Sequence, residues 1–195
     1  MALVERARRI LIRPREEWPV VAAEETTARD LYIGYIIPLA AIGPIASFVV
    51  LAVFGIQLPF AGTIRIAPAI ALAQAVVHYL LALAAVYVLA LAIDYLAPRF
   101  GGQPDRVQAL KVAAYSSTAA WIAGVFGLFP AIAILGILGA YSLYLLYLGL
   151  PVLMKSPADR SLPYTVAVVF AAIVLFILIA IVGRLFVRYP SMGLY

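Results

Sequence analysis

Five stretches of the chain contain no Asp, Glu, Lys or Arg and are long enough to cross a membrane. A hydrocarbon core of roughly 30 Å takes about 20 helical residues. In lipid, backbone polar groups are satisfied only within a helix or a closed barrel, and these runs lack the alternation that a barrel would need. We therefore predict an all-α, polytopic membrane helix bundle with five transmembrane helices. They are placed at residues 33–54, 66–93, 112–129, 131–154 and 164–183.

The composition agrees with a membrane protein and excludes several kinds of chemistry. Apolar residues make up 66% of the 195 residues and charged residues 12%, whereas a soluble domain is about half apolar and a quarter charged. The absence of cysteine excludes disulfides, thiolate metal sites and iron–sulfur clusters. A single histidine argues against a His-based metal centre. No spacing supplies a nucleophile with its base, so we expect no catalytic residues, no metal and no cofactor.

The third and fourth predicted spans form one charge-free run, residues 112–154, which is too long for a single crossing. Pro130 lacks a backbone N–H and disfavours helix at Phe129, the residue before it. We therefore predict a tight helical hairpin at this Phe-Pro step.

The distribution of Lys and Arg predicts the orientation. With five spans, eleven of the 14 basic residues lie on the side of the N-terminus. We therefore expect a cytoplasmic N-terminus and an external C-terminus; one span more or fewer would move only the C-terminus. The expected organisation is a cytoplasmic amphipathic segment (1–32), a five-helix transmembrane domain (33–183) and a short external tail (184–195). The net charge of +5 fits this topology and anionic lipids, and gives no argument for nucleic acid.

The N-terminal segment has an amphipathic pattern, because Leu3, Ala7, Ile10 and Leu11 fall on one helical face. This is typical of a helix that lies in the membrane interface with its arginines toward anionic headgroups. An ordinary helix packed on the cytoplasmic end of the bundle is the alternative. Trp18 is expected to be an interfacial anchor.

A run of acidic residues follows this first helix. Their spacing does not bring them together on one helix, so we interpret them as a solvated, charged face beside the membrane and not as a cation site. They are Glu16, Glu17, Glu24, Glu25 and Asp30.

Polar residues inside membrane spans are the main candidates for a functional site. Gln74 and His78 are four residues apart and share one face of the second span. With Tyr115, Ser116 and Tyr141 they form a candidate intramembrane polar site, in which His78 would line a cavity, bind a substrate or relay a proton. Alternatively, Gln74 and His78 only hydrogen-bond to a neighbouring helix, a contact that stabilises by about 0.6–2 kcal/mol.

The third span carries a face of small residues, which allows close packing of helices. Its members are Ala119, Ala120, Ala123, Gly124 and Gly127.

The fourth span is marked by tyrosines at every third position: Tyr141, Tyr144 and Tyr147. The last two approach the interface, where an aromatic belt is the usual finding. Tyr141 lies deeper and needs a hydrogen-bond partner. Gly149 and Pro151 predict a bend or an early end of this helix.

Several of these segments resemble the prokaryotic branch of the Yip1 family. They are residues 14–18, 30–32, 115–124 and 141–155, and the resemblance extends over about residues 5–183. It implies five membrane helices, a cytoplasmic N-terminus and a place in the cytoplasmic membrane of a prokaryote. Eukaryotic members are associated with Rab GTPases and vesicle traffic. Their Asp-Leu-Tyr-Gly-Pro motif is only partly present from Asp30 onward, so Rab binding is not carried over.

Two functions from different classes fit these observations. The first is a non-enzymatic scaffold or adaptor that acts on lipid organisation, on other membrane proteins or on further copies of itself. The second is a small-molecule or ion permease or channel built around His78. The proline-interrupted first span (Pro38 and Pro44) favours the second reading, since transport sites often use broken helices.

Overall fold

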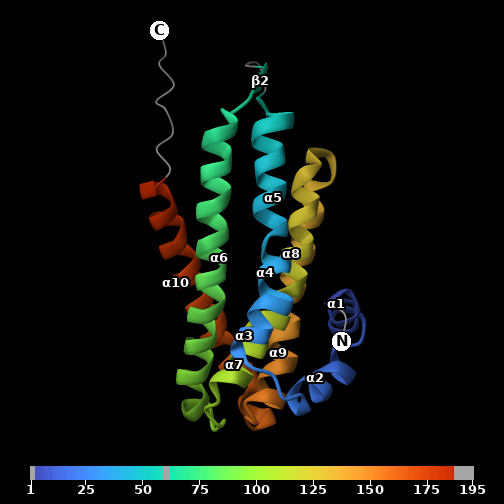
Figure 1. Ribbon diagram of the computed structural model, residues 1–195. Coiled ribbons are helices and arrows are strands. Elements are labelled where there is room, and N and C mark those ends of the chain that lie inside the picture. Colours follow the sequence, from blue (N-terminus) through green and yellow to red (C-terminus); the bar gives the residue numbers. More distant parts are fainter. Residues whose placement is uncertain (1–2, 59–61, 187–195) are drawn as a thin grey trace.

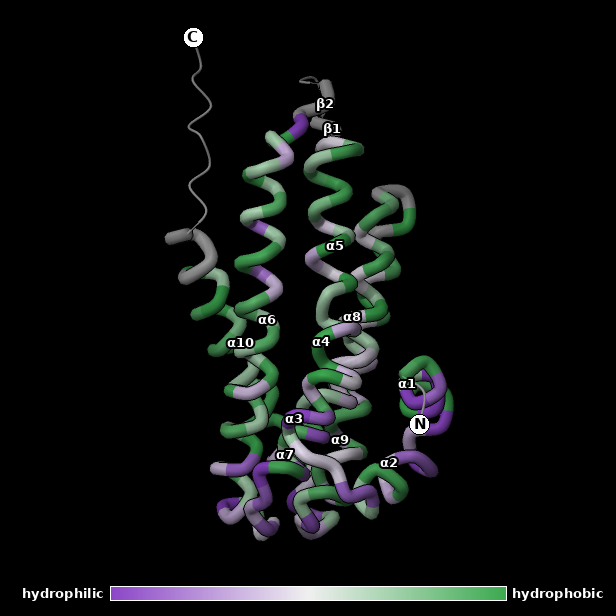
Figure 2. The backbone as a smooth tube through the Cα atoms, viewed as in Figure 1, coloured by the Kyte–Doolittle hydropathy of each residue, from purple (hydrophilic) through white to green (hydrophobic). Residues whose placement is uncertain are grey.

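The computed structural model describes residues 3–58 and 62–186, which form a bundle of long helices running in roughly the same direction (Figure 1). Two short helices lie beside one end of the bundle, called here the N-terminal end. A small β-hairpin lies at the opposite end, called here the hairpin end. Hydrophilic residues gather at the N-terminal end, while the helices between the two ends are mainly hydrophobic (Figure 2).

The two short helices are α1 (Leu3–Ile12) and α2 (Pro14–Ala23), together called the N-terminal pair. Pro14 occupies the first turn of α2, where its fixed φ suits the helix. The apolar face of α1 is turned into the protein, since Ala7 and Ile10 are 5% and 0% exposed. The structure therefore supports the second alternative for this segment, a helix packed on the end of the bundle, and not a helix lying in the membrane interface.

The first membrane span is interrupted at its prolines. The helix breaks at Ala41, whose N–H donates to Leu39 instead of to Ile37. The Tyr79 hydroxyl donates to the carbonyl of Ile37 at 2.9 Å and so replaces the bond that the break removes. The elements are α3 (Ala28–Leu31), the π-helical turn η1 (Tyr32–Ile36), α4 (Ile37–Ala40), α5 (Ile42–Val49) and the π-helical turn η2 (Val50–Phe54).

A two-stranded antiparallel hairpin follows, which the all-α prediction did not include. Strands β1 (Ile56–Leu58) and β2 (Gly62–Ile64) pair with Ile56 opposite Ile64. Gly55 joins the hairpin to η2 with a φ of 77°, a conformation that favours glycine.

The two longest helices are α6 (Pro68–Leu96) and α10 (Ser161–Phe186), which lie side by side. The 3₁₀ turn η3 (Ala97–Phe100) ends α6. Near the N-terminal end the Tyr164 hydroxyl donates to the carbonyl of Ile93 at 2.5 Å, which locks α10 to α6. α10 continues past the predicted span to Phe186, and the remaining residues of the predicted tail lie outside the described residues.

The predicted third span is not one helix. It is divided into α7 (Arg106–Ser116), α8 (Thr118–Ala123) and the 3₁₀ helix η4 (Gly124–Leu128), with a break at Ser117. The hydroxyls at the break bond to the backbone: Ser117 Oγ donates to Ala113 O and Thr118 Oγ1 to Tyr115 O, both at 2.7 Å. Side-chain hydroxyls that capture carbonyls of the preceding turn often bend helices.

The prediction of five spans is therefore wrong in its count. Within residues 3–58 and 62–186, four helical segments are long and apolar enough to cross a membrane. The third predicted span fails because its helical stretches are short and its first part is buried in protein. The four are Ala28–Phe54, Pro68–Phe100, Ile134–Leu153 and Ala158–Ile181.

The hairpin predicted at the Phe-Pro step is present. η4 ends at Leu128, Phe129 is extended, and the 3₁₀ helix η5 (Pro130–Ala140) begins at the proline. With 11 residues, η5 is much longer than most 3₁₀ helices, which rarely exceed about three or four residues. η5 continues into α9 (Tyr141–Leu153), and the 3₁₀ turn η6 (Ala158–Arg160) leads to α10.

Candidate functional site at the N-terminal end

Trp18 fixes α2 on the bundle. Its side chain is fully buried, and a Cβ added at Gly149 of α9 would lie 2.7 Å from its Cζ2 atom. Only glycine leaves room for so close an approach of the indole. Tyr115 of α7 meets the ring edge-on, with centroids 6.4 Å apart. Trp18 is thus inserted into the protein, and its predicted role as an anchor at the lipid interface is wrong.

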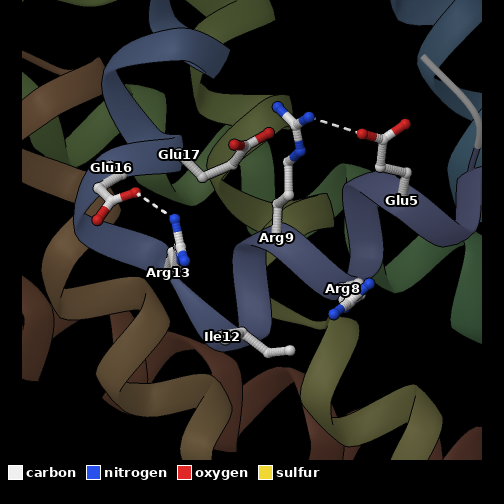
Figure 3. Close-up of a pocket in the computed structure, with 7 residues that line it drawn as sticks. All are labelled: Glu5, Arg8, Arg9, Ile12, Arg13, Glu16 and Glu17. Carbon is white, nitrogen blue, oxygen red and sulfur yellow. Dashed lines mark hydrogen bonds and ion pairs between the residues drawn. The ribbon is translucent and has the colours of Figure 1, made fainter.

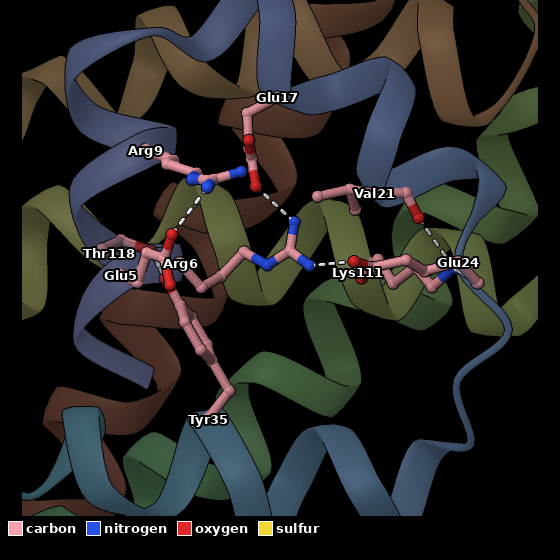
Figure 4. A network of polar contacts seen from close by, with 9 residues as sticks. All are labelled: Glu5, Arg6, Arg9, Glu17, Val21, Glu24, Tyr35, Lys111 and Thr118. Carbon is pink, nitrogen blue, oxygen red and sulfur yellow. Dashed lines mark hydrogen bonds and ion pairs between the residues drawn. The ribbon is translucent and has the colours of Figure 1, made fainter. Parts of the chain in front are cut away.

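An ion cluster joins α1, α2 and the bundle (Figure 4). Arg6 of α1 is 4% exposed, and its two terminal nitrogens bond separately to the carboxylates of Glu17 and Glu24. The guanidinium also lies over the Tyr115 ring, 5.7 Å from its centroid. Charges removed from water are tolerated only when paired and hydrogen-bonded, so these contacts join α1 to both ends of α2.

Lys111 of α7 joins the same cluster from the bundle side. Its side chain is 2% exposed, and Nζ donates to the carbonyls of Val21 at 2.9 Å and Glu24 at 2.5 Å. These carbonyls lie at the end of α2, where helical C=O groups lack partners and a cation is favourable. We call Arg6, Glu17, Glu24 and Lys111 the docking cluster.

The two cations of the docking cluster respond differently to burial. Burial lowers the pKa of Lys111, and the charges of Glu24 and Asp105 offset this only in part. For Arg6, burial also acts to lower the pKa, but the hydrogen bond and charge of Glu24 outweigh it and raise the pKa above its ordinary value. Arg6 therefore stays charged, whereas burial makes the charged form of Lys111 less favourable than it is in water.

Hydroxyl groups complete the attachment. The Tyr141 hydroxyl of α9 donates to the carbonyl of Leu11 in α1 at 3.1 Å, which supplies the partner that this deep tyrosine needs. Tyr35 and Thr118 share a hydrogen bond of 2.7 Å, and Tyr35 packs edge-on against Tyr115 with centroids 4.6 Å apart. The N-terminal pair is thus bonded to α7 and α9, while the Tyr35–Thr118 bond joins η1 to α8.

The acidic run is divided between two environments. Glu16, Glu25 and Asp30 are exposed, as expected of a solvated face. Glu17 is only 4% exposed and Glu24 is held by Arg6 and Lys111, so the expectation is wrong for these two. They lie on different turns, and the packing of α1 against α2 brings both to the guanidinium of Arg6.

The outer side of the N-terminal pair carries a shallow, charged cavity of about 490 Å³ (Figure 3). Arg9 pairs with Glu5 at 2.6 Å and Arg13 with Glu16 at 3.6 Å. Arg8 forms no ion pair with any residue in the described part of the chain. The arginines expected to face anionic headgroups are therefore mostly matched by carboxylates.

The five residues of the predicted intramembrane polar site lie in separate places. Gln74 is buried in α6, whereas His78 on the same helix is exposed. Tyr115 and Ser116 belong to the N-terminal end of the bundle, where Ser116 Oγ donates to Ala113 O at 3.3 Å. Tyr141 bonds to α1.

The small residues of the third span lie in close contacts. A Cβ on Gly124 would be 3.2 Å from the Cα of Gly43 in α5. A Cβ on Gly139 of η5 would be 3.3 Å from the Cα of Ala120. Ala119 and Ala123 are 7% and 6% exposed, whereas nothing lies within 4 Å of a Cβ at Gly127.

The remaining motif residues lie on α9. Tyr144 and Tyr147 are 38% and 39% exposed. Pro151 lies inside the helix, which continues for two more residues to Leu153. The space at Gly149 is filled by the Trp18 indole.

The sequence pattern did not indicate the docking cluster: Arg6 and Lys111 were not singled out, and Glu17 and Glu24 were interpreted as solvated acids. One signal was available, because residues 1–32 contain six acidic and six basic side chains. Matched charges within a short segment favour internal pairing. The sequence did not show which pairs would be buried.

One comparison with known proteins gives a match. A family model described as the Yip1 domain matches residues 8–181, which include α2, the membrane-spanning helices and three of the four docking-cluster residues. No curated protein and no solved structure gives a significant match. Because the match covers most of the chain and four segments are suited to crossing a membrane, this integral membrane protein belongs to the Yip1 domain family.

Proposed function

We propose that this Yip1 domain protein is a non-enzymatic scaffold or adaptor in the cytoplasmic membrane of a prokaryote, and that the N-terminal pair is its adaptor surface. The N-terminal pair lies on the cytoplasmic side in this proposal, and the C-terminus lies outside. The family membership and the apolar helices support a membrane role. The partner would be another membrane protein or a second copy of the chain, with anionic lipids at its edge.

One observation carries this proposal: the N-terminal pair is held rigidly while its outer side stays open. The docking cluster and Trp18 use the inner side. On the outer side Val4 and Ile12 are 74% and 65% exposed, with Arg8 between them one helical turn from each. A surface that is already ordered loses little conformational entropy on binding, which favours recognition.

A photo-crosslinking residue at Val4, introduced in the full chain in native membranes, tests the proposal. We expect one discrete protein adduct, of a partner or of a second copy. Val166 of α10 is the matched control, since it is 60% exposed but lies within a membrane span. Adducts to lipid alone at Val4, or the same adducts at both positions, would contradict an adaptor surface.

The proposed orientation is tested separately with a topology reporter fused after Tyr195. An external reading is expected although only four segments are long enough to span alone, because α7, α8 and η4 together still carry the chain from the N-terminal end toward the hairpin end, and α10 starts near the N-terminal end and runs away from it (Figure 1). A cytoplasmic reading would refute the external C-terminus without affecting the adaptor proposal.

A further inference from the structure

A second cavity, of about 430 Å³, lies between the membrane-spanning helices and away from the N-terminal pair. Its walls come from α5, α6, α8 and α10, and most of its side chains are apolar. The volume is within the range of about 300–1,000 Å³ usual for small-molecule sites. We call it the lateral groove and define it by Pro44, Ser47, His78, Trp121, Phe176 and Ile179.

His78 places a polar group of the lateral groove deep in the membrane. It is the eleventh residue of α6, which begins at Pro68. Ten residues at 1.5 Å rise put it about 15 Å from the start of the helix, close to the middle of a hydrocarbon core of roughly 30 Å. A phospholipid headgroup remains at the interface and does not reach this depth. A polar group that meets His78 must itself dissolve in hydrocarbon.

The imidazole is open to such a group. His78 is exposed and makes no hydrogen bond or ion pair with any residue among 3–58 and 62–186. Ser117, which also lines the lateral groove, already donates its hydroxyl to Ala113 O at 2.7 Å. Because unsatisfied polar groups are costly in lipid, the histidine favours an occupant that brings a hydrogen-bonding atom.

Two aromatic side chains line the same groove as His78: Trp121 on α8 and Phe176 on α10. Phe176 is 71% exposed, so the groove is open to the surrounding acyl chains at this point. Aromatic side chains pack against flat rings in offset or edge-on contacts. The groove thus offers ring contacts, one hydrogen-bonding group and an opening for a long apolar tail.

We propose that the lateral groove binds a membrane-dissolved quinone. The ring packs against Trp121 and Phe176, a ring carbonyl accepts a hydrogen bond from His78, and the apolar tail leaves through the opening into the bilayer. An ordinary acyl chain lacks the hydrogen-bonding group that His78 requires. This binding is independent of the adaptor role, which rests on the N-terminal pair.

Tryptophan fluorescence tests the proposal, because the chain has only two tryptophans. In the Trp18→Phe variant, Trp121 is the sole reporter and lies in the groove. The full chain in phosphatidylcholine nanodiscs is titrated with decylubiquinone. We expect saturable quenching, at least tenfold weaker with His78→Leu and retained with His78→Gln, which keeps a hydrogen-bond donor. In Trp121→Phe, where the remote Trp18 reports, quenching should not saturate.

Two controls make the result decisive. Tyr95→Phe changes an exposed α6 residue outside the groove and should leave quenching unchanged. Decylbenzene, which has the ring and tail but no carbonyl, should not compete. Quenching that rises linearly and equally in the His78→Leu protein overturns the proposal. Equal competition by decylbenzene also overturns it. So does a loss of Trp121 quenching when the chain dimerises, because the occupant of the groove would then be a second copy of the chain.

Discussion

Two pairs of helices are attached to the bundle in different ways. The N-terminal pair is held by buried charges and by one indole on a glycine. The hairpin of α8, η4 and η5, called here the glycine hairpin, is held to α5 by the close approach of Gly124 to Gly43, and its two arms meet at Gly139 and Ala120. The residues that face outward also differ. Ile134 and Ile137 of the glycine hairpin are 76% and 71% exposed, as suits lipid contact.

The difference follows from the solvent around each pair. Within lipid, burying apolar side chains gains little, so helices associate through close van der Waals packing of small residues. At the membrane boundary, water competes for every polar group, and a few directional ion pairs shielded from water decide the geometry. The N-terminal pair should therefore detach through loss of single contacts, whereas the glycine hairpin should loosen only through steric crowding.

The largest effect is expected from Arg6→Met. Glu17 would then be a buried carboxylate without its partner, at a cost of about 3–5 kcal/mol, or a rise of more than a hundredfold in the open fraction. Because the chain has no cysteine, a single cysteine at the buried Ile10 reports opening through its rate of maleimide labelling.

Arg8→Met is the matched control, since this arginine is exposed and should leave labelling unchanged. The double variant Arg6→Met/Glu17→Met should recover most of the protection, because it removes the orphaned charge. Equal protection in Arg6→Met and the natural sequence would show that the ion cluster does not hold the pair.

Gly149→Val is expected to have the next effect. Its Cβ would meet the indole of Trp18 at 2.7 Å, and such overpacking costs about 1–3 kcal/mol. Labelling at position 10 should rise about fivefold to a hundredfold. Gly136→Val, where no atom lies within 4 Å of the added Cβ, serves as the control. A labelling rate that stays at the control value would mean that α2 is not held by this contact.

Gly124→Val tests the glycine hairpin. The added side chain meets the Cα of Gly43 at 3.2 Å, so α8 and α5 must separate slightly, at a cost of about 1–2 kcal/mol. The thermal midpoint in detergent should fall while labelling at position 10 stays unchanged. Gly127→Val has free space and should not lower the midpoint. If labelling at position 10 rose as well, the N-terminal pair and the glycine hairpin would not be held independently.

The smallest effect concerns pH. Burial depresses the pKa of Lys111, so at pH values approaching the ordinary lysine pKa the detached state binds more protons than the docked state. Docking should therefore strengthen as pH rises toward the ordinary lysine pKa of about 10.4, by at most about 1.4 kcal/mol per pH unit. Urea titrations followed by Trp18 emission in a Trp121→Phe background measure this. Lys111→Met should flatten that part of the profile; an identical slope would exclude Lys111 as its source.

The sequence by itself determined the membrane class, the approximate positions of most spans and the hairpin at Phe129 and Pro130. These depend on local properties: apolar length sets a crossing, and proline ends a helix wherever it occurs. The spacing of small residues likewise identified a packing face, although not that Gly124 would meet Gly43.

Only the tertiary structure decided which charges are buried and which helices remain whole. Glu17 and Glu24 look like solvated acids until α1 folds back and places Arg6 between them. Trp18 looks like a lipid anchor until Gly149, far along the chain, offers the space for it. The helix break at Ser117 depends on the hydroxyls of Ser117 and Thr118, which donate to nearby backbone carbonyls and not to solvent. Each outcome depends on partners that are distant in sequence or on a competition between hydrogen bonds. The pattern of residues along the chain does not show which partner or which bond is the more favourable.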